Sequence, residues 1–184
     1  MLATETRLKG CFILEPEVLS DERGYFLESY NAEKLHEILG YSPSFVQDNQ
    51  SHSGFGVVRG LHMQTGDFSQ AKLIRVLQGS VIDVAVDVRE GSETYGQSIS
   101  VELSAENKKQ LYIPRGFLHG FSVVSETATF FYKCDNAYNK SSENGVNPLD
   151  PELNIDWKIP PEQLIISEKD EKAQSFKELK SNVN

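Results

Sequence analysis

Three side chains in this sequence place a proton-transferring or charged group within an apolar run. His62, in VVRGLHMQ, is either a strand-end histidine that satisfies a buried hydrogen bond, or a general base or metal ligand. Tyr132, in FFYKC, is either a core residue or a general acid. Lys72 shares a predicted strand face with Ile74 and Val76. Its ammonium group therefore either reaches solvent along apolar surface or stabilises a developing oxyanion inside a barrel.

A carboxylate and a second histidine extend this set. Asp170, in SEKD, either stabilises the first turn of a helix or accepts a hydrogen bond from a histidine and fixes its tautomer. His119 lies in YIPRGFLHGF, where a turn at Pro114-Arg115-Gly116 separates two predicted strands. The pattern Pro-x-Gly-x-x-His is similar to the second signature of cupin-type jelly rolls, in which the histidine points into a small barrel.

A metal site is disfavoured by the residues around His62. Metal-binding cupins usually carry His-x-His followed by an acidic ligand, but Gln64 occupies the position two residues after His62. No Glu or Asp follows at the expected place before Gly79. Because Gln is a poor ligand for zinc or iron, we expect no metal here. Separately, we expect no other cofactor.

The charge of the chain excludes some partners and leaves others open. The 18 basic and 27 acidic residues give a net charge of −9, which argues against binding to nucleic acid. Binding of a small anion depends on nearby cationic side chains and not on the net charge of the chain. Arg23, Arg59, Lys72 and Lys169 are either ordinary surface charges or a cradle for a diphosphate, because cationic side chains match phosphate oxygens.

The elements that must position these residues are mainly strands. Many short, alternating apolar segments bounded by turn residues predict a β sandwich or closed barrel. In one of them, Val84 and Val86 face one way and Asp83 and Ala85 the other, and a hairpin is expected around residues 78–80. A short helix is expected over residues 31–40, capped by Asn31. A second helix is expected to begin after Ser167. Strict alternation would place Arg59 and His62 on opposite faces of their strand.

Length and composition indicate one domain, residues 1–184, working in the cytoplasm. The first ten residues contain no apolar segment of a signal peptide, and no apolar run approaches the roughly 20 residues of a membrane span. Cys11 and Cys134 are expected to be reduced thiols.

Several motifs occur in an order that resembles the dTDP-4-dehydrorhamnose 3,5-epimerase family, and the resemblance covers about residues 10–175. These motifs are DERGYFLESY, FVQDNQSHS, VVRGLHMQ, QAKLIRVLQGSVIDVAVDVREGSETYGQ, LSAENKKQLYIPRGFLHGFSV, FFYKCDNAY and LIISEKD. Met63 stands where the family often has an aromatic residue, and Asn147 where it usually has Trp. The second departure weakens the alignment of Glu143.

The resemblance implies a mainly β, cupin-type jelly-roll barrel with short peripheral helices, which works as a metal-free homodimeric isomerase. It assigns His62 as the base, Asp170 as its partner, Tyr132 as the acid and Lys72 as a contact near the sugar carbonyl. The implied contacts with a dTDP-sugar substrate are Arg23, Glu28, Gln47, Asp48, Asn49, Arg59, His119, Tyr138, Glu143 and Lys169, with Tyr138 stacking on the thymine ring.

The implied reaction inverts C3 and C5 of dTDP-4-keto-6-deoxy-D-glucose to give dTDP-4-keto-L-rhamnose, in dTDP-L-rhamnose biosynthesis. Three alternatives remain at this point. They are an epimerase that acts on one carbon or on another nucleotide-sugar, a metal-dependent cupin enzyme, and a noncatalytic sugar-binding jelly roll.

Overall fold

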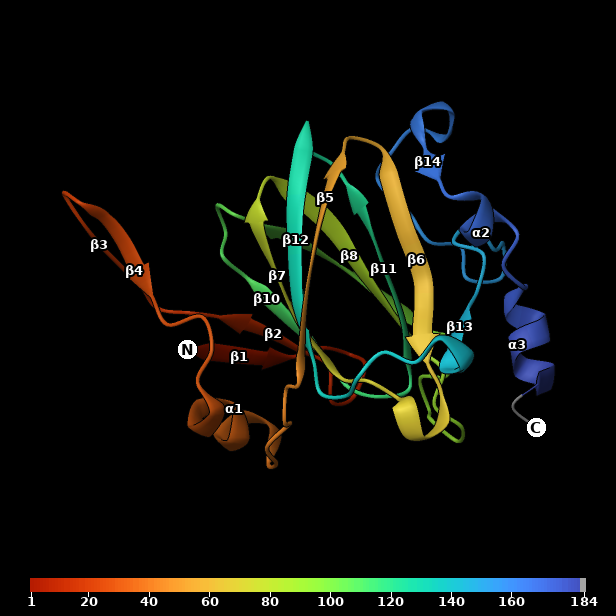
Figure 1. Cartoon of the computed structure of the whole chain (residues 1–184), viewed down its shortest axis with the longest axis horizontal. Coiled ribbons are helices and arrows are strands. Elements are labelled where there is room, and N and C mark those ends of the chain that lie inside the picture. Colours follow the sequence, from red (N-terminus) through yellow and green to blue (C-terminus); the bar gives the residue numbers. More distant parts are fainter. Residues whose placement is uncertain (183–184) are drawn as a thin grey trace.

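Two antiparallel sheets packed face to face make up most of the protein (Figure 1). The computed structural model describes residues 1–182, so the last two residues of the expected domain lie outside the described residues. The first sheet contains, in spatial order, β1 (Leu2–Glu5), β2 (Phe12–Glu15), β10 (Gln110–Ile113), β7 (Lys72–Gln78), β12 (Thr127–Cys134) and β5 (Gln47–Gly54).

The second sheet faces the first. It contains, in spatial order, β13 (Glu143–Gly145), β6 (Val57–Gln64), β11 (Phe117–Val123), β8 (Ser80–Asp87) and β9 (Ser98–Ser104). The two-residue strand β14 (Ile165–Ile166) pairs parallel to β6. Three short 3-10 helices lie outside the sheets, at Gly66–Phe68, Lys140–Ser142 and Pro161–Gln163.

The predicted hairpin around residues 78–80 is wrong. β7 pairs with β10 and β12, whereas β8 pairs with β9 and β11, so the turn at Gly79 carries the chain from one sheet to the other. The turn after Pro114 does the same between β10 and β11. Short loops of this kind read like hairpins in the sequence, because a turn and two alternating strands look alike in both cases.

A small hairpin and three helices flank the sheets. The hairpin of β3 (Val18–Asp21) and β4 (Gly24–Leu27) projects away from the sheets (Figure 1). Helix α1 (Ala32–Leu39) begins after Asn31, whose side chain accepts hydrogen bonds from two backbone amides, and ends at Gly40, as expected. Ser167 caps α2 (Glu168–Glu171), so this helix begins where expected, and α3 (Phe176–Asn182) follows as a separate helix.

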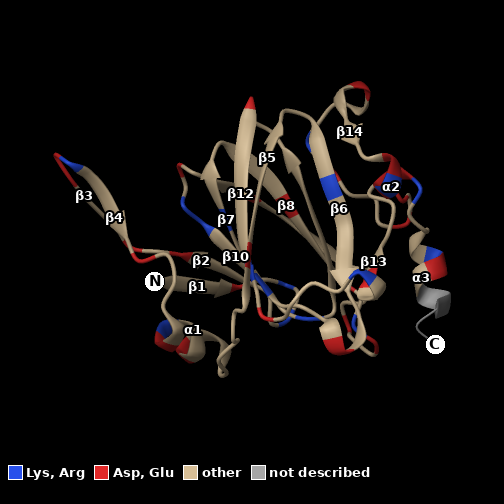
Figure 2. Ribbon diagram, in the orientation of Figure 1, with Lys and Arg blue, Asp and Glu red and all other residues tan. Residues whose placement is uncertain are grey.

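Apolar side chains form a core between the sheets and one core on each outer face. The central core includes Ile74, Ala85 and Phe130. Val84 and Val86 point to the other side of β8, under the segment that follows β13, so the predicted alternation is confirmed. Figure 2 shows charged residues mainly on loops, helices and the projecting hairpin, with few along the strands. A charged residue between the sheets therefore needs an explanation.

Candidate active site

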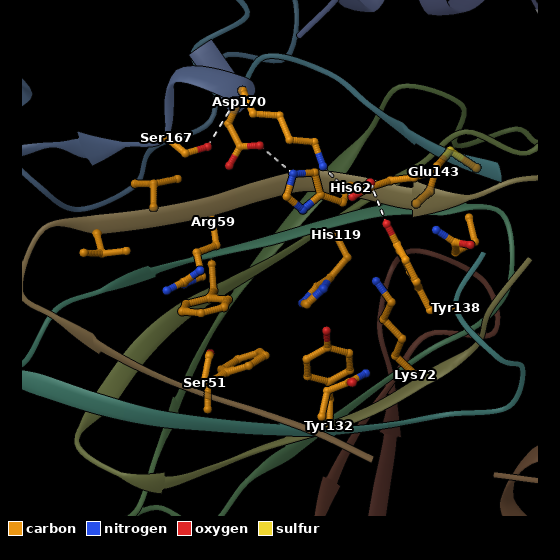
Figure 3. Close-up of a pocket in the computed structure, with 18 of the residues that line it drawn as sticks. Ser51, Arg59, His62, Lys72, His119, Tyr132, Tyr138, Glu143, Ser167 and Asp170 are labelled. Carbon is orange, nitrogen blue, oxygen red and sulfur yellow. Dashed lines mark hydrogen bonds and ion pairs between the residues drawn. The ribbon is translucent and has the colours of Figure 1, made fainter. Parts of the chain in front are cut away.

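One cavity of about 710 Å³ opens between the two sheets. Its lining contains all five residues that the sequence analysis singled out for chemistry, namely His62, Lys72, His119, Tyr132 and Asp170. Figure 3 shows His62 on one wall and Tyr132 on the other, with the tyrosine hydroxyl directed toward the space between them. Residues that are up to 108 positions apart in the chain thus share one enclosed space.

His62 and Asp170 form a short hydrogen bond at the wall made by β6 and α2. His62 Nε2 lies 2.6 Å from Asp170 Oδ1, and the aspartate side chain is buried. Burial alone would raise the pKa of Asp170, but the hydrogen bond and the charge of His62 outweigh it, so the pKa lies below its usual value. The carboxylate therefore accepts the proton of Nε2, which leaves Nδ1 of a neutral His62 ring as an acceptor.

Arg59 lines the same cavity as His62, so the expectation that they face opposite ways is wrong. The alternation is interrupted at Gly60, whose φ of +125° is rarely adopted by other residues. A Cβ on Gly60 would lie 2.6 Å from Cα of Gly120, so β6 and β11 approach closely here. This approach also leaves His119 directly opposite His62 in the strand pairing.

Lys72 and Tyr132 come from neighbouring strands of the first sheet. Lys72 Nζ lies 5.8 Å from the centroid of the Tyr132 ring. Burial lowers the pKa of Lys72, because the charged form loses its hydration. Burial raises the pKa of Tyr132 to about 12, so the phenol carries its proton at neutral pH.

His119 is held by an aspartate that the sequence analysis did not single out. His119 Nε2 lies 2.7 Å from Asp83 Oδ1, and both side chains are almost completely buried. The His119 ring centroid lies 6.5 Å from that of Tyr132. A carboxylate in the middle of the apolar run VIDVAV was the signal that could have identified Asp83.

Charged and aromatic residues line the mouth of the cavity. Lys169 Nζ lies 2.7 Å from Glu143 Oε1, and the Tyr138 hydroxyl donates to Glu143 Oε2 at 3.0 Å (Figure 3). Half of Tyr138 is exposed, at 52 %. Its ring is therefore available to a planar group of a ligand.

The predicted contacts from β5 divide between two directions. Asn49 lines the cavity, and Gln47 supports it by donating to Asn49 Oδ1 at 2.9 Å. Asp48 instead pairs with Lys133 Nζ at 3.0 Å and does not belong to the cavity lining. A substrate contact by Asp48 stays a prediction.

Arg23 and Glu28 also lie outside the lining of the cavity. Arg23 occupies the turn of the projecting β3–β4 hairpin, where it pairs with Asp21 and its side chain is 85 % exposed. Glu28 follows this hairpin and binds Lys34 Nζ at 2.7 Å. The family resemblance implied that Arg23 and Glu28 contact the substrate with the others, but the fold of one chain does not bring them to this cavity.

Three further features of residues 1–182 concern metal binding, the cysteines and membrane helices. Within residues 1–182, no group of three or more His, Cys, Asp or Glu side chains is arranged to hold a metal ion. Cys11 and Cys134 are buried free thiols, as expected. Among the described helices, none has the length and apolar character needed to cross a membrane.

The arrangement fits proton transfer beside a carbonyl group. An imidazole, a protonated phenol and a half-buried lysine surround one space, with the acid and the base on opposite walls. A base on one face and an acid on the other can invert a carbon centre, and a nearby cation can stabilise the enolate between the two steps.

Comparison with known proteins gives consistent matches. A family model described as dTDP-4-dehydrorhamnose 3,5-epimerase matches residues 5–178. The chain is 47% identical over 176 residues to the dTDP-4-dehydrorhamnose 3,5-epimerase of Shigella flexneri, covering 96% of both chains.

Solved structures show the same similarity in three dimensions. A dTDP-4-dehydrorhamnose 3,5-epimerase from Elizabethkingia anophelis has a TM-score of 0.94 and 58% identity, with 97% of each chain covered. A 3,5-epimerase from Legionella pneumophila, solved in complex with dTDP-4-keto-L-rhamnose, has a TM-score of 0.94 and 46% identity, with 99% of this chain and 96% of that one covered. These likenesses confirm the predicted cupin-type jelly roll.

Proposed function

This chain belongs to the dTDP-4-dehydrorhamnose 3,5-epimerase family, and from that premise we propose how its cavity performs the reaction. The protein is an isomerase that inverts C3 and C5 of dTDP-4-keto-6-deoxy-D-glucose and yields dTDP-4-keto-L-rhamnose, in dTDP-L-rhamnose biosynthesis. Both carbons flank the C4 carbonyl. Their protons are acidic only because the carbanion is delocalised into an enolate, so the enzyme must stabilise negative charge on the carbonyl oxygen.

Lys72 is the cation that stabilises this oxygen in our proposal. Its position inside the cavity removes it from bulk water, where its charge would be screened. An ammonium group in this low-dielectric setting favours an enolate over a neutral ketone, because the attraction grows as negative charge develops.

His62 takes the proton from C3 and from C5 in turn. The bond between Nε2 and Asp170 supports this assignment, since it leaves the basic Nδ1 nitrogen for the substrate and favours the imidazolium that forms. Asp170 acts through His62 and does not itself need to touch the sugar.

Tyr132 returns a proton to the opposite face of each carbon. Its hydroxyl is protonated at neutral pH, and it lies across the cavity from His62. The placement of these two groups on opposite walls of one cavity is the observation that carries the proposed mechanism, because inversion requires removal and delivery on different faces.

The diphosphate and the thymine bind toward the mouth of the cavity. Arg59 and Lys169 supply positive charge there, and the exposed ring of Tyr138 can stack on the base. The remaining contacts that we propose on this chain are Gln47, Asp48, Asn49, His119 and Glu143.

We further propose that the enzyme is a homodimer whose β3–β4 hairpin reaches the partner's cavity. An isolated two-stranded hairpin is marginal in water, yet this one exposes Leu19, Tyr25 and Phe26 by 57 %, 61 % and 68 %. A second copy would cover these side chains. It would also deliver Arg23 to a diphosphate that carries the opposite charge, with Glu28 nearby. A cytoplasmic location stays a prediction.

Incubation with dTDP-4-keto-6-deoxy-D-glucose in deuterium oxide tests the function. We expect NMR of the product to show deuterium and inversion at both C3 and C5. Treatment with a chelator should leave the rate unchanged, because no metal takes part in the proposed mechanism. Label at one carbon only would make the protein a single-carbon epimerase. Absence of label at both would contradict the enolate mechanism.

A further inference from the structure

Asp83 is a buried carboxylate that the mechanism above does not use. It lies in β8, is 0 % exposed, and points to the side of the strand that faces the first sheet, as Ala85 does. Charged residues are less common along the strands of the two sheets than on the loops and helices (Figure 2). An ionised carboxylate inside a core is costly unless other groups compensate it, so Asp83 requires a partner.

Only one of its oxygen atoms has a hydrogen-bond partner. Oδ1 accepts from His119 Nε2 at 2.7 Å, whereas Oδ2 is buried and has no hydrogen-bond partner among residues 1–182. Leaving a buried acceptor unpaired costs free energy, because the group has lost its hydration without gaining a partner. Packing alone does not account for a residue that retains this cost.

The groups around Asp83 include cationic and titratable side chains with which its charge can interact. Lys72, on the facing strand β7, interacts electrostatically with both Asp83 and His119. The other titratable groups near this cluster are His62 on β6, Tyr132 and Cys134 on β12, Glu143 on β13 and Cys11 before β2. Glu143 is the other carboxylate in this set, and Asp83 is the one that lies in the interior beside both Lys72 and His119.

Burial and mutual attraction act in opposite directions on this cluster. Burial raises the pKa of Asp83 and lowers the pKa of both Lys72 and His119, which alone would neutralise all three. The attraction between Asp83 and Lys72 opposes this, since it lowers the pKa of the acid and raises that of the base. Opposite charges on Asp83 and Lys72, beside a neutral His119, would leave this cluster without net charge.

We propose that Asp83 is a positioning residue for the epimerisation, which fixes the proton of His119 on Nε2 and supplies the counter-charge that keeps Lys72 an ammonium ion. With Nε2 donating to the carboxylate, Nδ1 of His119 is an acceptor. The part that concerns Lys72 rests on the proposed function, because in that function the Lys72 ammonium group stabilises the enolate oxygen.

Asp87 offers a matched control on the same strand. It lies four residues from Asp83 on the same face and is also 0 % exposed. Both of its oxygens are satisfied, Oδ1 by Arg89 and Oδ2 by Arg89, Ser92 and Thr94. Asp87 is therefore explained as a structural residue, and it does not line the cavity.

The first test uses the wild-type protein and does not depend on activity. Nitrogen-15 NMR of the four histidines, with His119→Gln to assign the signal, reports which ring nitrogen carries the proton. We expect His119 to be neutral and protonated on Nε2 between about pH 6 and 9. Protonation on Nδ1 alone, or a fully charged ring at neutral pH, would overturn the first half of the proposal.

The second test compares Asp83→Asn with Asp87→Asn in the profile of kcat against pH. Activity falls as pH rises through the pKa of Lys72, and removal of the Asp83 charge lowers that pKa. We therefore expect the alkaline limb of Asp83→Asn to move to lower pH by about one unit, with kcat at neutral pH reduced about tenfold or more. Tyr132, with a pKa of about 12, stays protonated over this range and does not produce the limb.

The outcomes separate this inference from the proposed function. A limb for Asp83→Asn that coincides with those of wild type and Asp87→Asn would overturn the counter-charge. Loss of folding in Asp83→Asn alone, detected by melting temperature, would also count against a positioning role. If the wild-type protein fails to exchange protons with solvent, the proposed function fails, while the NMR measurement still decides the His119 tautomer.

Discussion

At the scale of residues, this protein separates the roles of two proton-carrying groups by their environments. His62 keeps a free nitrogen because Asp170 occupies the other one, and Tyr132 keeps its proton because burial raises its pKa to about 12. Tyr132 thus carries its proton at neutral pH before the substrate arrives, and the bond to Asp170 leaves Nδ1 of His62 to accept one. This difference predicts that loss of either residue gives a distinct defect.

We expect His62→Ala to abolish exchange of the C3 and C5 protons with deuterium oxide and to lower kcat by about 10²–10⁴-fold, because His62 is the base that removes them in the proposed mechanism. Tyr132→Phe should instead retain exchange on the His62 face while inversion is lost or stops after one carbon. Proton NMR of the recovered sugar distinguishes these results. Normal turnover in His62→Ala would eliminate the proposed base.

At the scale of elements, the close antiparallel pairing of β6 and β11 positions both histidines. A side chain on Gly60 would meet Cα of Gly120 at 2.6 Å and the carbonyl oxygen of His119 at 2.7 Å. The two strands could not then keep their spacing. Residues 59, 62 and 119 reach one cavity because this spacing is so small.

Gly60→Ala should therefore destabilise the protein by more than the roughly 1–3 kcal/mol that an unfavourable φ costs by itself. Gly24→Ala is the matched control, because Gly24 has a similar φ of +118° but a methyl group on its Cα would meet no atom within 4 Å. Denaturant unfolding of both variants measures the difference. Equal losses would show that the contact with β11 is not what makes glycine necessary at residue 60.

At the scale of the whole molecule, a single chain lacks part of the proposed binding site. The β3–β4 hairpin carries Arg23 away from the sheets, and its apolar residues are exposed. Exchange of such an element between two copies is a common route to a symmetric dimer. In a shared site, residues from two subunits can restore each other's function, which a site within one chain does not allow.

Arg23→Ala and His62→Ala should each impair activity, but dimers formed from both variants should regain some. One site of such a mixed dimer combines an intact His62 with an intact Arg23 from the other subunit. Random assortment then predicts about a quarter of wild-type activity in the co-expressed mixture, and about half in mixed dimers isolated with both tags. Co-expression with two affinity tags and light scattering measure this, and either a monomer or a lack of recovery would contradict the shared site.

Much of the site could be recognised from local sequence, because local patterns decide which residue types share a strand face. The alternation predicted that Lys72 shares a strand face with Ile74 and Val76 and left open whether its ammonium group reaches solvent; in the structure Lys72 lines the cavity. Asn31 and Ser167 were recognised as helix caps for the same reason, since a cap depends on residues within one turn.

The sequence by itself determined the residue types, the strand faces and the motif order that identify this family. Only the tertiary structure decided that Gly79 joins two sheets, that Arg59 shares a cavity with His62, and that Asp83 stands behind His119. Strand pairing, φ at Gly60 and the charges that meet in a core all depend on segments far apart in the chain. No pattern of neighbouring residues can specify them.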